Sequence, residues 1–195
     1  MKIVNALWFC LTSSTILAME NSNAAVITSI MKHDLSKIRI RHQKELKLSD
    51  VQAHTHEKEL KRFLSICAIY GPGTGMFSEK VDNMWHNFIL FTSDYTKFCK
   101  EHTGKFIHHE PTTEDVDKKQ TAQLAREFIK RYHGLFSENP PKEIWGLENA
   151  PCLSLNTADA NCKTNCNNCA QCSFACKGFC MTSDAPSTEK HTEIK

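Results

Sequence analysis

The segment Val81-Asp82-Asn83-Met84-Trp85-His86 decides the fold, because it is the centre of the clearest helical pattern in the sequence. Its apolar members, followed by Phe88 and Ile89, recur at three- and four-residue spacing. Residues at that spacing share one face of an α-helix, and an apolar face is buried against other elements. Ser78 is a good N-cap. We therefore predict a buried helix that begins after Ser78.

A second amphipathic helix precedes this one. Its apolar residues again have helical spacing, and they are Leu60, Phe63, Leu64, Cys67, Ala68 and Ile69. The glycine-rich segment 71–75 ends that helix. It is predicted to be a plain loop, because no Gly-Lys-Ser/Thr sequence follows the glycines and no strand precedes them.

The pattern continues downstream of the Trp-His segment. Gly104 is predicted to end a helix, and residues 106–111 to be extended, because the residue before a proline disfavours the helical region. A further helix is predicted at 113–133, with Gly134 at its end, and Trp145 packs back to close the domain. The sequence therefore predicts an all-α fold, with a compact domain of about four helices at residues 55–147.

Composition is that of a globular domain with extensions. The chain has 195 residues, of which 41% are hydrophobic and 24% charged, and both fractions are ordinary. A net charge of +2 is too small to favour a nucleic-acid partner. We therefore expect no nucleic-acid partner, and an unknown protein partner remains open.

The N-terminus has the pattern of a targeting signal. Lys2 precedes a mostly apolar run over residues 3–18, and Ser22-Asn23-Ala24 fits a small-x-small site for cleavage before Ala25. The run is too short and polar to span a membrane stably. Residues 1–24 are thus predicted to be a secretory signal peptide, which implies a periplasmic or secreted protein. The alternative is a buried or interfacial helix. Residues 25–54 form an N-terminal extension with helical content.

Candidate metal ligands cluster in the domain, and they are Asp82, His86, Cys99, His108 and His109. Asp82 and His86 lie one helical turn apart, at the edge of the apolar face. A partly buried carboxylate beside an imidazole needs a partner, and carboxylate, imidazole and thiolate are zinc ligands. Only one of the two adjacent histidines can face His86 from an extended segment. The plainer reading is a structural hydrogen bond.

Residues 148–180 are rich in cysteine, and residues 181–195 form a polar tail that we expect to be disordered. Intervals of three, two, two, three and three residues separate Cys162, Cys166, Cys169, Cys172, Cys176 and Cys180. On a helix they would fall within an arc of ~120°, which suits Cu(I) or Zn. The inner four match a ferredoxin spacing, but the proline that normally follows is absent. In an oxidising compartment disulfides are the plain expectation for these cysteines, and a metal–thiolate site is the alternative.

The residues around the Trp-His segment resemble the pattern of a known family. The stretch Val81-Asp82-x-x-Trp85-His86-x-x-Ile89-Leu90-x-Thr92-x-x-Tyr95-x-x-Phe98-Cys99, followed by Gly104-x-Phe106-x-His108-His109-x-Pro111, resembles the glycine-rich domain-containing protein-like family, in its small bacterial form. The similarity covers about residues 55–147. Relatives usually read Trp-His-x-His, whereas Phe88 stands at the last position here. If that histidine is a ligand in relatives, the resemblance implies that a four-ligand site here would have to recruit Cys99 or His108/His109. If it only packs in relatives, Phe88 is a harmless replacement.

Three functions compete. The first is an exported protein that binds a transition metal, Zn or Cu(I), through the His/Cys/Asp cluster, the cysteine tail or both. The second is a non-catalytic interaction module with a disulfide-stapled tail. The third is a hydrolase-type enzyme that uses His86 as acid or base and Asp82 to orient it. Because no nucleophile motif or nucleotide fingerprint accompanies that pair, catalysis ranks last.

Overall fold

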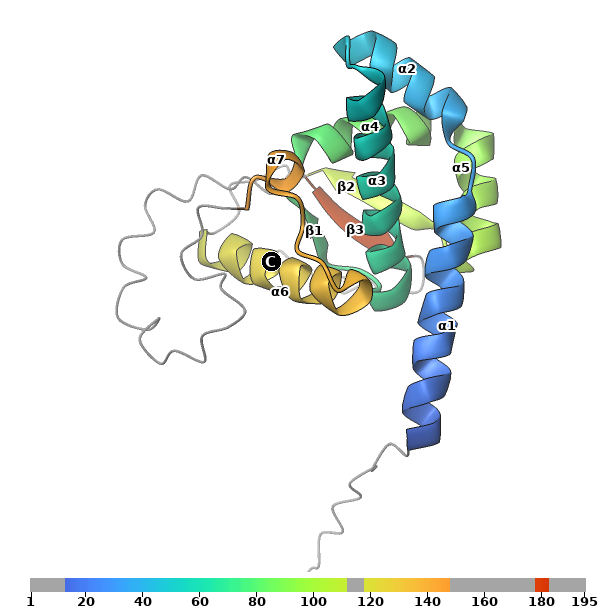
Figure 1. Cartoon of the computed structure of the whole chain (residues 1–195), viewed down its shortest axis with the longest axis vertical. Coiled ribbons are helices and arrows are strands. Elements are labelled where there is room, and N and C mark those ends of the chain that lie inside the picture. The colour runs from blue at the N-terminus through green and yellow to red at the C-terminus, as the bar shows by residue number, and fades with distance from the viewer. Residues whose placement is uncertain (1–12, 112–117, 148–177, 183–195) are drawn as a thin grey trace, which may run out of the picture.

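The computed structural model describes residues 13–111, 118–147 and 178–182 of the chain. Helices dominate this part, and a small sheet lies beside them (Figure 1). The helices are α1 (Ser13–Lys32), α2 (Ser36–Leu46), α3 (Asp50–Tyr70), α4 (Glu79–Leu90), α5 (Thr92–Phe98), the π-helix η1 (Cys99–Thr103), α6 (Lys118–Phe136) and α7 (Lys142–Trp145). The strands are β1 (Thr74–Met76), β2 (Ile107–Pro111) and β3 (Gly178–Thr182). The predicted all-α class is confirmed as a mostly helical fold, with more helices than expected and a small sheet in addition.

Helix α3 crosses the middle of the molecule and packs against α1, α2, α4 and α6. Ser49 caps its start, because its side chain accepts a hydrogen bond from the backbone N–H of Gln52. The Gln52 side chain accepts one from the backbone N–H of Ser49 in return. This capping box satisfies two N–H groups that a helix end otherwise leaves without partners. It fixes where α3 begins, and therefore which of its residues face the core.

Aromatic side chains fill the core. Trp85 and Trp145 are almost fully buried, and the Phe63 ring lies 5.2 Å from the first and 6.1 Å from the second, centroid to centroid. Tilted and edge-on ring pairs of this kind are favourable. The Ser78 hydroxyl accepts from the backbone N–H of Val81, so the predicted cap of α4 is confirmed.

One carboxylate is buried within this core. Glu59 is 1% exposed, and its Oε2 accepts hydrogen bonds from the Tyr132 hydroxyl at 2.9 Å and from the Trp145 indole N–H at 2.8 Å. The Arg62 guanidinium lies 3.4 Å from the other oxygen and also pairs with Glu138. Glu59 thereby ties α3 to α6 and α7. Trp145 does pack back onto the domain, as predicted.

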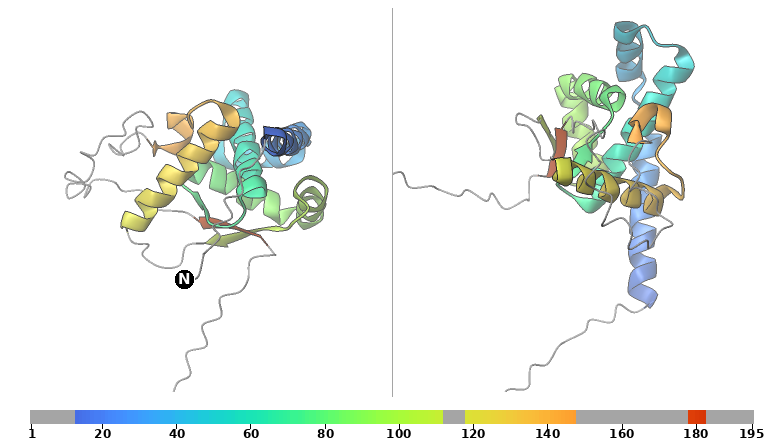
Figure 2. Two further views of the ribbon diagram at one scale, coloured as in Figure 1. Left: turned by 90° about the horizontal axis from the view of Figure 1, so that it is seen from below. Right: turned by 90° about the vertical axis from the view of Figure 1, so that its left-hand side faces the viewer.

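The strands form an antiparallel sheet in the order β1-β3-β2. Figure 2 shows it along one side of the helices. The central strand, β3, comes from the C-terminal part of the chain, and its Cys180 is paired in register with Thr74 of β1 and with His109 of β2. β1 begins within the segment predicted as a plain loop, whereas β2 coincides with the segment predicted as extended. Strands this short carry too little periodicity to be recognised.

The N-terminal helices join the same core. Residues 15–25 of α1 are mostly exposed, and this half projects from the body in Figures 1 and 2. Ile30, Leu35 and Ile38 are buried against the residues of the central domain. The segment treated as an extension, 25–54, therefore contributes to the core of the domain. Within the described residues, no helix combines the length and apolarity that a membrane span needs.

Two histidine pairs fasten these helices. Nδ1 of His33 lies 2.9 Å from Nε2 of His102, which joins the end of α1 to η1. Nε2 of His42 lies 2.9 Å from Nδ1 of His56, which joins α2 to α3. Burial lowers the pKa of His33, His42 and His102, and burial with the neighbouring His42 and Lys80 lowers the pKa of His56 to about 4. The four imidazoles are therefore uncharged at neutral pH.

Glycine positions agree in part with the predictions. Gly104 follows η1 in the left-handed conformation, with φ 68°, as expected of a helix C-cap. The prediction that Gly134 ends its helix is wrong, because α6 continues through Gly134 to Phe136. The left-handed position falls instead on Ser137, with φ 53°, whose N–H bonds back to the carbonyl of His133.

Candidate metal site

Helix α4 presents the first two residues of the candidate site. Asp82 and His86 are one turn apart, and 3.7 Å separates Oδ2 of Asp82 from Nδ1 of His86. The Asp82 side chain is 9% exposed, whereas that of His86 is 51% exposed. The Ser78 cap sets the start of α4 and so turns Asp82 inward, towards the sheet. The carboxylate is thus enclosed, and the imidazole lies at the opening.

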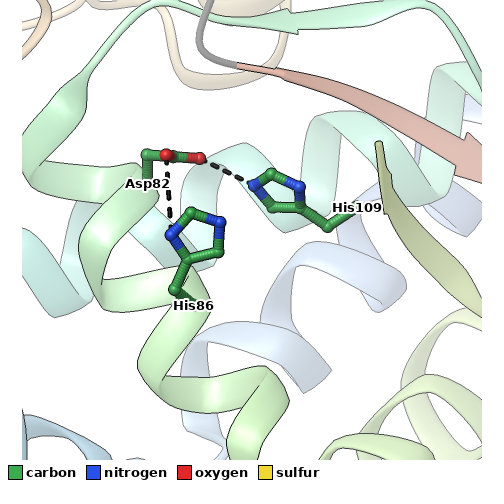
Figure 3. Close-up of side chains that lie close together, drawn as sticks. All are labelled: Asp82, His86 and His109. Atoms are coloured by element: carbon green, nitrogen blue, oxygen red, sulfur yellow. Dashed lines mark hydrogen bonds and ion pairs between the residues drawn. The ribbon is translucent and has the colours of Figure 1, made fainter. Parts of the chain in front are cut away.

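Strand β2 supplies the third residue. Nε2 of His109 lies 2.8 Å from Oδ1 of Asp82, and the His109 side chain is only 4% exposed. Its ring packs between the rings of Trp85 and His86, at centroid distances of 4.4 and 4.5 Å. Figure 3 shows both imidazoles turned towards the carboxylate, with one at each of its two oxygens. The strand therefore delivers a buried imidazole onto the same carboxylate that α4 presents.

These three side chains could hold a metal ion. One ligand atom from each lies within 4.8 Å of the other two. One carboxylate and two imidazoles are a donor set that zinc and neighbouring divalent metals accept. Because His86 is half exposed, an ion there would keep a side open to solvent. Three protein ligands with an open position are typical of a catalytic or exchangeable site, whereas structural zinc sites are closed by four.

A buried tyrosine, Tyr95, helps to hold β2, the strand that carries His109, against α4. The Tyr95 hydroxyl accepts from the Trp85 indole N–H at 3.1 Å and donates to the carbonyl of Ile107. This links α4, α5 and the first residue of β2, two positions before His109. Burial raises the pKa of Tyr95, so the hydroxyl stays protonated and keeps both bonds. The position of β2 against α4 is thereby constrained.

The remaining predicted ligands of the domain lie elsewhere. Cys99 is buried beside the Tyr95 hydroxyl, and His108 is exposed with its ring against Phe106. Neither belongs to the cluster of Asp82, His86 and His109. The adjacent histidines point opposite ways, which is the alternation expected of an extended segment.

The cysteine tail falls largely outside the described residues. Cys162, Cys166, Cys169, Cys172 and Cys176 lie in the segment 148–177, which the structure does not describe. Cys180 lies in β3, where its backbone is paired with that of His109. The predicted disordered tail, 181–195, overlaps the end of β3, and residues 183–195 are also outside the described part.

Neither of the two histidine pairs was predicted from the sequence. His56 lies four residues before Leu60 in α3, and His42 lies four residues after Ile38 in α2. Each histidine therefore continues a buried stripe, since residues at that spacing share a helix face. A histidine on an apolar stripe signals burial. The stripe does not reveal that its partner is a second histidine from another helix.

One comparison with known proteins gives a match. A family model described as UCP032817-like matches residues 23–139. No curated protein and no solved structure matches the chain. The resemblance to the glycine-rich domain-containing protein-like family is therefore wrong, since nothing in the comparisons indicates that family. The comparison of Phe88 with a ligand histidine of that family therefore has no basis, and Phe88 is a fully buried core residue.

Proposed function

The chain belongs to the UCP032817-like family, and we propose that it binds a divalent transition metal ion, with zinc the best match, through Asp82, His86 and His109. One observation carries the proposal. The gap of 3.7 Å between the Asp82 carboxylate and His86 is too long for a hydrogen bond. Two ligands at about 2.1 Å from one tetrahedral zinc ion would be roughly 3.4 Å apart. The gap therefore suits a shared ion.

Burial adds support. Asp82 has its carboxylate nearly enclosed, and His109 is its hydrogen-bond partner. An ion between them would take the place of the shared proton, because a ligating imidazole must give up the N–H that it now directs at Asp82. Binding would thus need a rotation of side chains only. The half-exposed His86 would act as the entrance ligand.

Equilibrium binding of zinc to the full chain tests this site. A parent variant with the seven tail cysteines from Cys152 to Cys180 changed to serine removes competing thiolates, so that the domain site is measured alone. We expect one zinc ion per parent chain. His109→Ala should weaken binding by at least about 100-fold, since losing even an outer partner of a ligand costs 10- to 100-fold.

The neighbouring histidine supplies the matched control. His108 is exposed and outside the cluster, so His108→Ala should leave the affinity within about threefold of the parent, as expected for a surface change. Zinc at a hundred times its Kd should also stabilise the parent by about 2.7 kcal/mol. An absence of zinc binding in the parent, or an equal loss in the two alanine variants, would contradict the proposal.

Export and the tail belong to the same proposal. The family match begins at residue 23, and the part of α1 that packs into the body follows the proposed cleavage point before Ala25, with Ile30 buried. Removal of residues 1–24 would thus leave Ile30 and the part of α1 that packs into the body in place. We propose that the exported chain carries a second, thiolate site for Cu(I) or zinc in its tail. The mass of the mature protein and the metal content of the tail variant against the native chain test these two points.

A further inference from the structure

A cavity of about 750 Å³ lies on a different side of α4 from the candidate metal site. The corner between α2 and α3 forms one wall, and the start of α4 and α7 form the others. Its apolar lining includes Leu48, Phe77, Ile144 and Trp145. Volumes of ~300–1,000 Å³ with mostly apolar walls and few polar groups are typical of small-molecule sites. A ligand in such a site is oriented by the few polar groups of its lining.

Two buried polar residues line the cavity, His56 and Ser78, and the Ser78 hydroxyl already donates to the backbone carbonyl of Ile144. His56 is 4% exposed. Its Nδ1 faces Nε2 of His42 at 2.9 Å, and no hydrogen bond to its Nε2 is found within the described part of the chain. His42 is fully buried, and among the described residues its Nδ1 has no hydrogen-bond partner.

The Nδ1 of His42 determines the tautomers of both imidazoles in this pair. A buried N–H without an acceptor costs more free energy than a buried ring nitrogen without a donor. His42 therefore carries its proton on Nε2, and its Nδ1 is unprotonated. His42 then donates to Nδ1 of His56, and a neutral His56 must carry its own proton on Nε2. Burial keeps the pKa of His56 at about 4, so this N–H is uncharged at neutral pH. Because His56 lines the cavity, this N–H is the neutral donor that it would offer to a ligand there.

Charges around the cavity select against ions of either sign. Lys80 lines it but already donates to the backbone carbonyl of Glu143. Glu79 and Glu143 also line the cavity, and both residues are exposed. One cation and two carboxylates leave no excess positive charge for an anion, and an apolar wall disfavours a cation.

We propose that this cavity binds a small, uncharged, largely apolar molecule through one carbonyl oxygen, which accepts a hydrogen bond from Nε2 of His56. The ligand class is a ketone, ester or amide on an apolar body. His42 acts as a positioning residue that fixes the tautomer of His56. This site does not depend on metal binding. The outcome of its test therefore does not affect the proposal for Asp82, His86 and His109.

Titration of the full chain with 4-phenylbutan-2-one, followed by NMR of ¹⁵N-labelled histidine, tests this inference. The free protein should show Nε2-protonated tautomers for His42 and His56. The ketone should shift the His56 signals saturably, whereas 4-phenylbutan-2-amine, a cation of the same shape, should leave them in place. An Nδ1-protonated His56, equal binding of ketone and amine, or tighter binding of 4-phenylbutanoate than of the ketone would overturn the assignment.

Variants add a second readout. His56→Phe removes the donor and should weaken ketone binding about tenfold, the value of one neutral hydrogen bond. His56→Gln restores an N–H at similar reach and should bind within about threefold of the native chain. His54→Phe, at an exposed histidine of the same helix, is the matched control and should not change the affinity. Equal losses in His54→Phe and His56→Phe would overturn the proposal, and the native-chain titration decides it if His56→Phe fails to fold.

Discussion

Replacing Glu59 with alanine should be among the most damaging single changes in this protein. The carboxylate is 1% exposed and serves two buried donors, the Tyr132 hydroxyl and the Trp145 indole N–H. Each donor left without an acceptor costs about 1–3 kcal/mol. Arg62 loses one partner but keeps Glu138. We therefore expect a loss of about 4 kcal/mol, a large part of the 5–15 kcal/mol that typically holds a fold.

Urea unfolding in the presence of a chelator, followed by tryptophan fluorescence, measures this loss. The slope of free energy against urea should stay constant, so that the change is one of stability and not of compactness. Glu127→Ala on α6 is the matched control, because Glu127 is exposed and should change stability by less than about 0.5 kcal/mol. A loss below about 1 kcal/mol for Glu59→Ala, or one equal to the control, would refute the reasoning.

Three further outcomes are expected. The free energy of unfolding should fall as the pH drops from neutral to 4.5. The reason is that an unfolded histidine takes up a proton near pH 6.5, whereas folded His56, with a pKa of about 4, stays neutral until lower pH. His56 alone accounts for about 2.5 kcal/mol of this fall, so that His56→Gln should show a fall smaller by that amount. Tyr95→Phe removes the acceptor of the buried Trp85 N–H and should cost about 1–3 kcal/mol by urea unfolding, so an unchanged midpoint would contradict the role given to the hydroxyl. Ser49→Ala should cost about 1 kcal/mol by removing the cap of α3, whereas Ser49→Asp should retain most of the stability; equal losses would show that capping is not the cause.

Helices of this fold are predictable because their signal is local. The stripe around Trp85 and the cap at Ser78 lie within one short segment, and both are found as predicted. The sheet is different, since its central strand brings Cys180 beside Thr74 and His109. Such a pairing joins parts of the chain that are far apart in sequence. Short strands with no clear alternation give no sign of it.

The candidate site was predictable to the same extent. The spacing of Asp82 and His86 places them one turn apart on α4, and alternation along an extended segment separates His108 from His109. Which of the two histidines faces the helix depends on how β2 lies against α4, and that is a tertiary property. Cys99 was included because of its chemistry, but it lies beside Tyr95, away from the cluster.

The buried Glu59 also bears on the order in which the chain can fold. Its two neutral donors are 73 and 86 residues further along the sequence. Until Trp145 has been synthesised and has docked, α3 would have to bury a carboxylate with its bonds incomplete, which is unfavourable. The core around Glu59 therefore cannot be completed one helix at a time as the chain is synthesised from the N-terminus. We expect a late, cooperative closing step, of the kind that slows folding when contacts are distant in sequence.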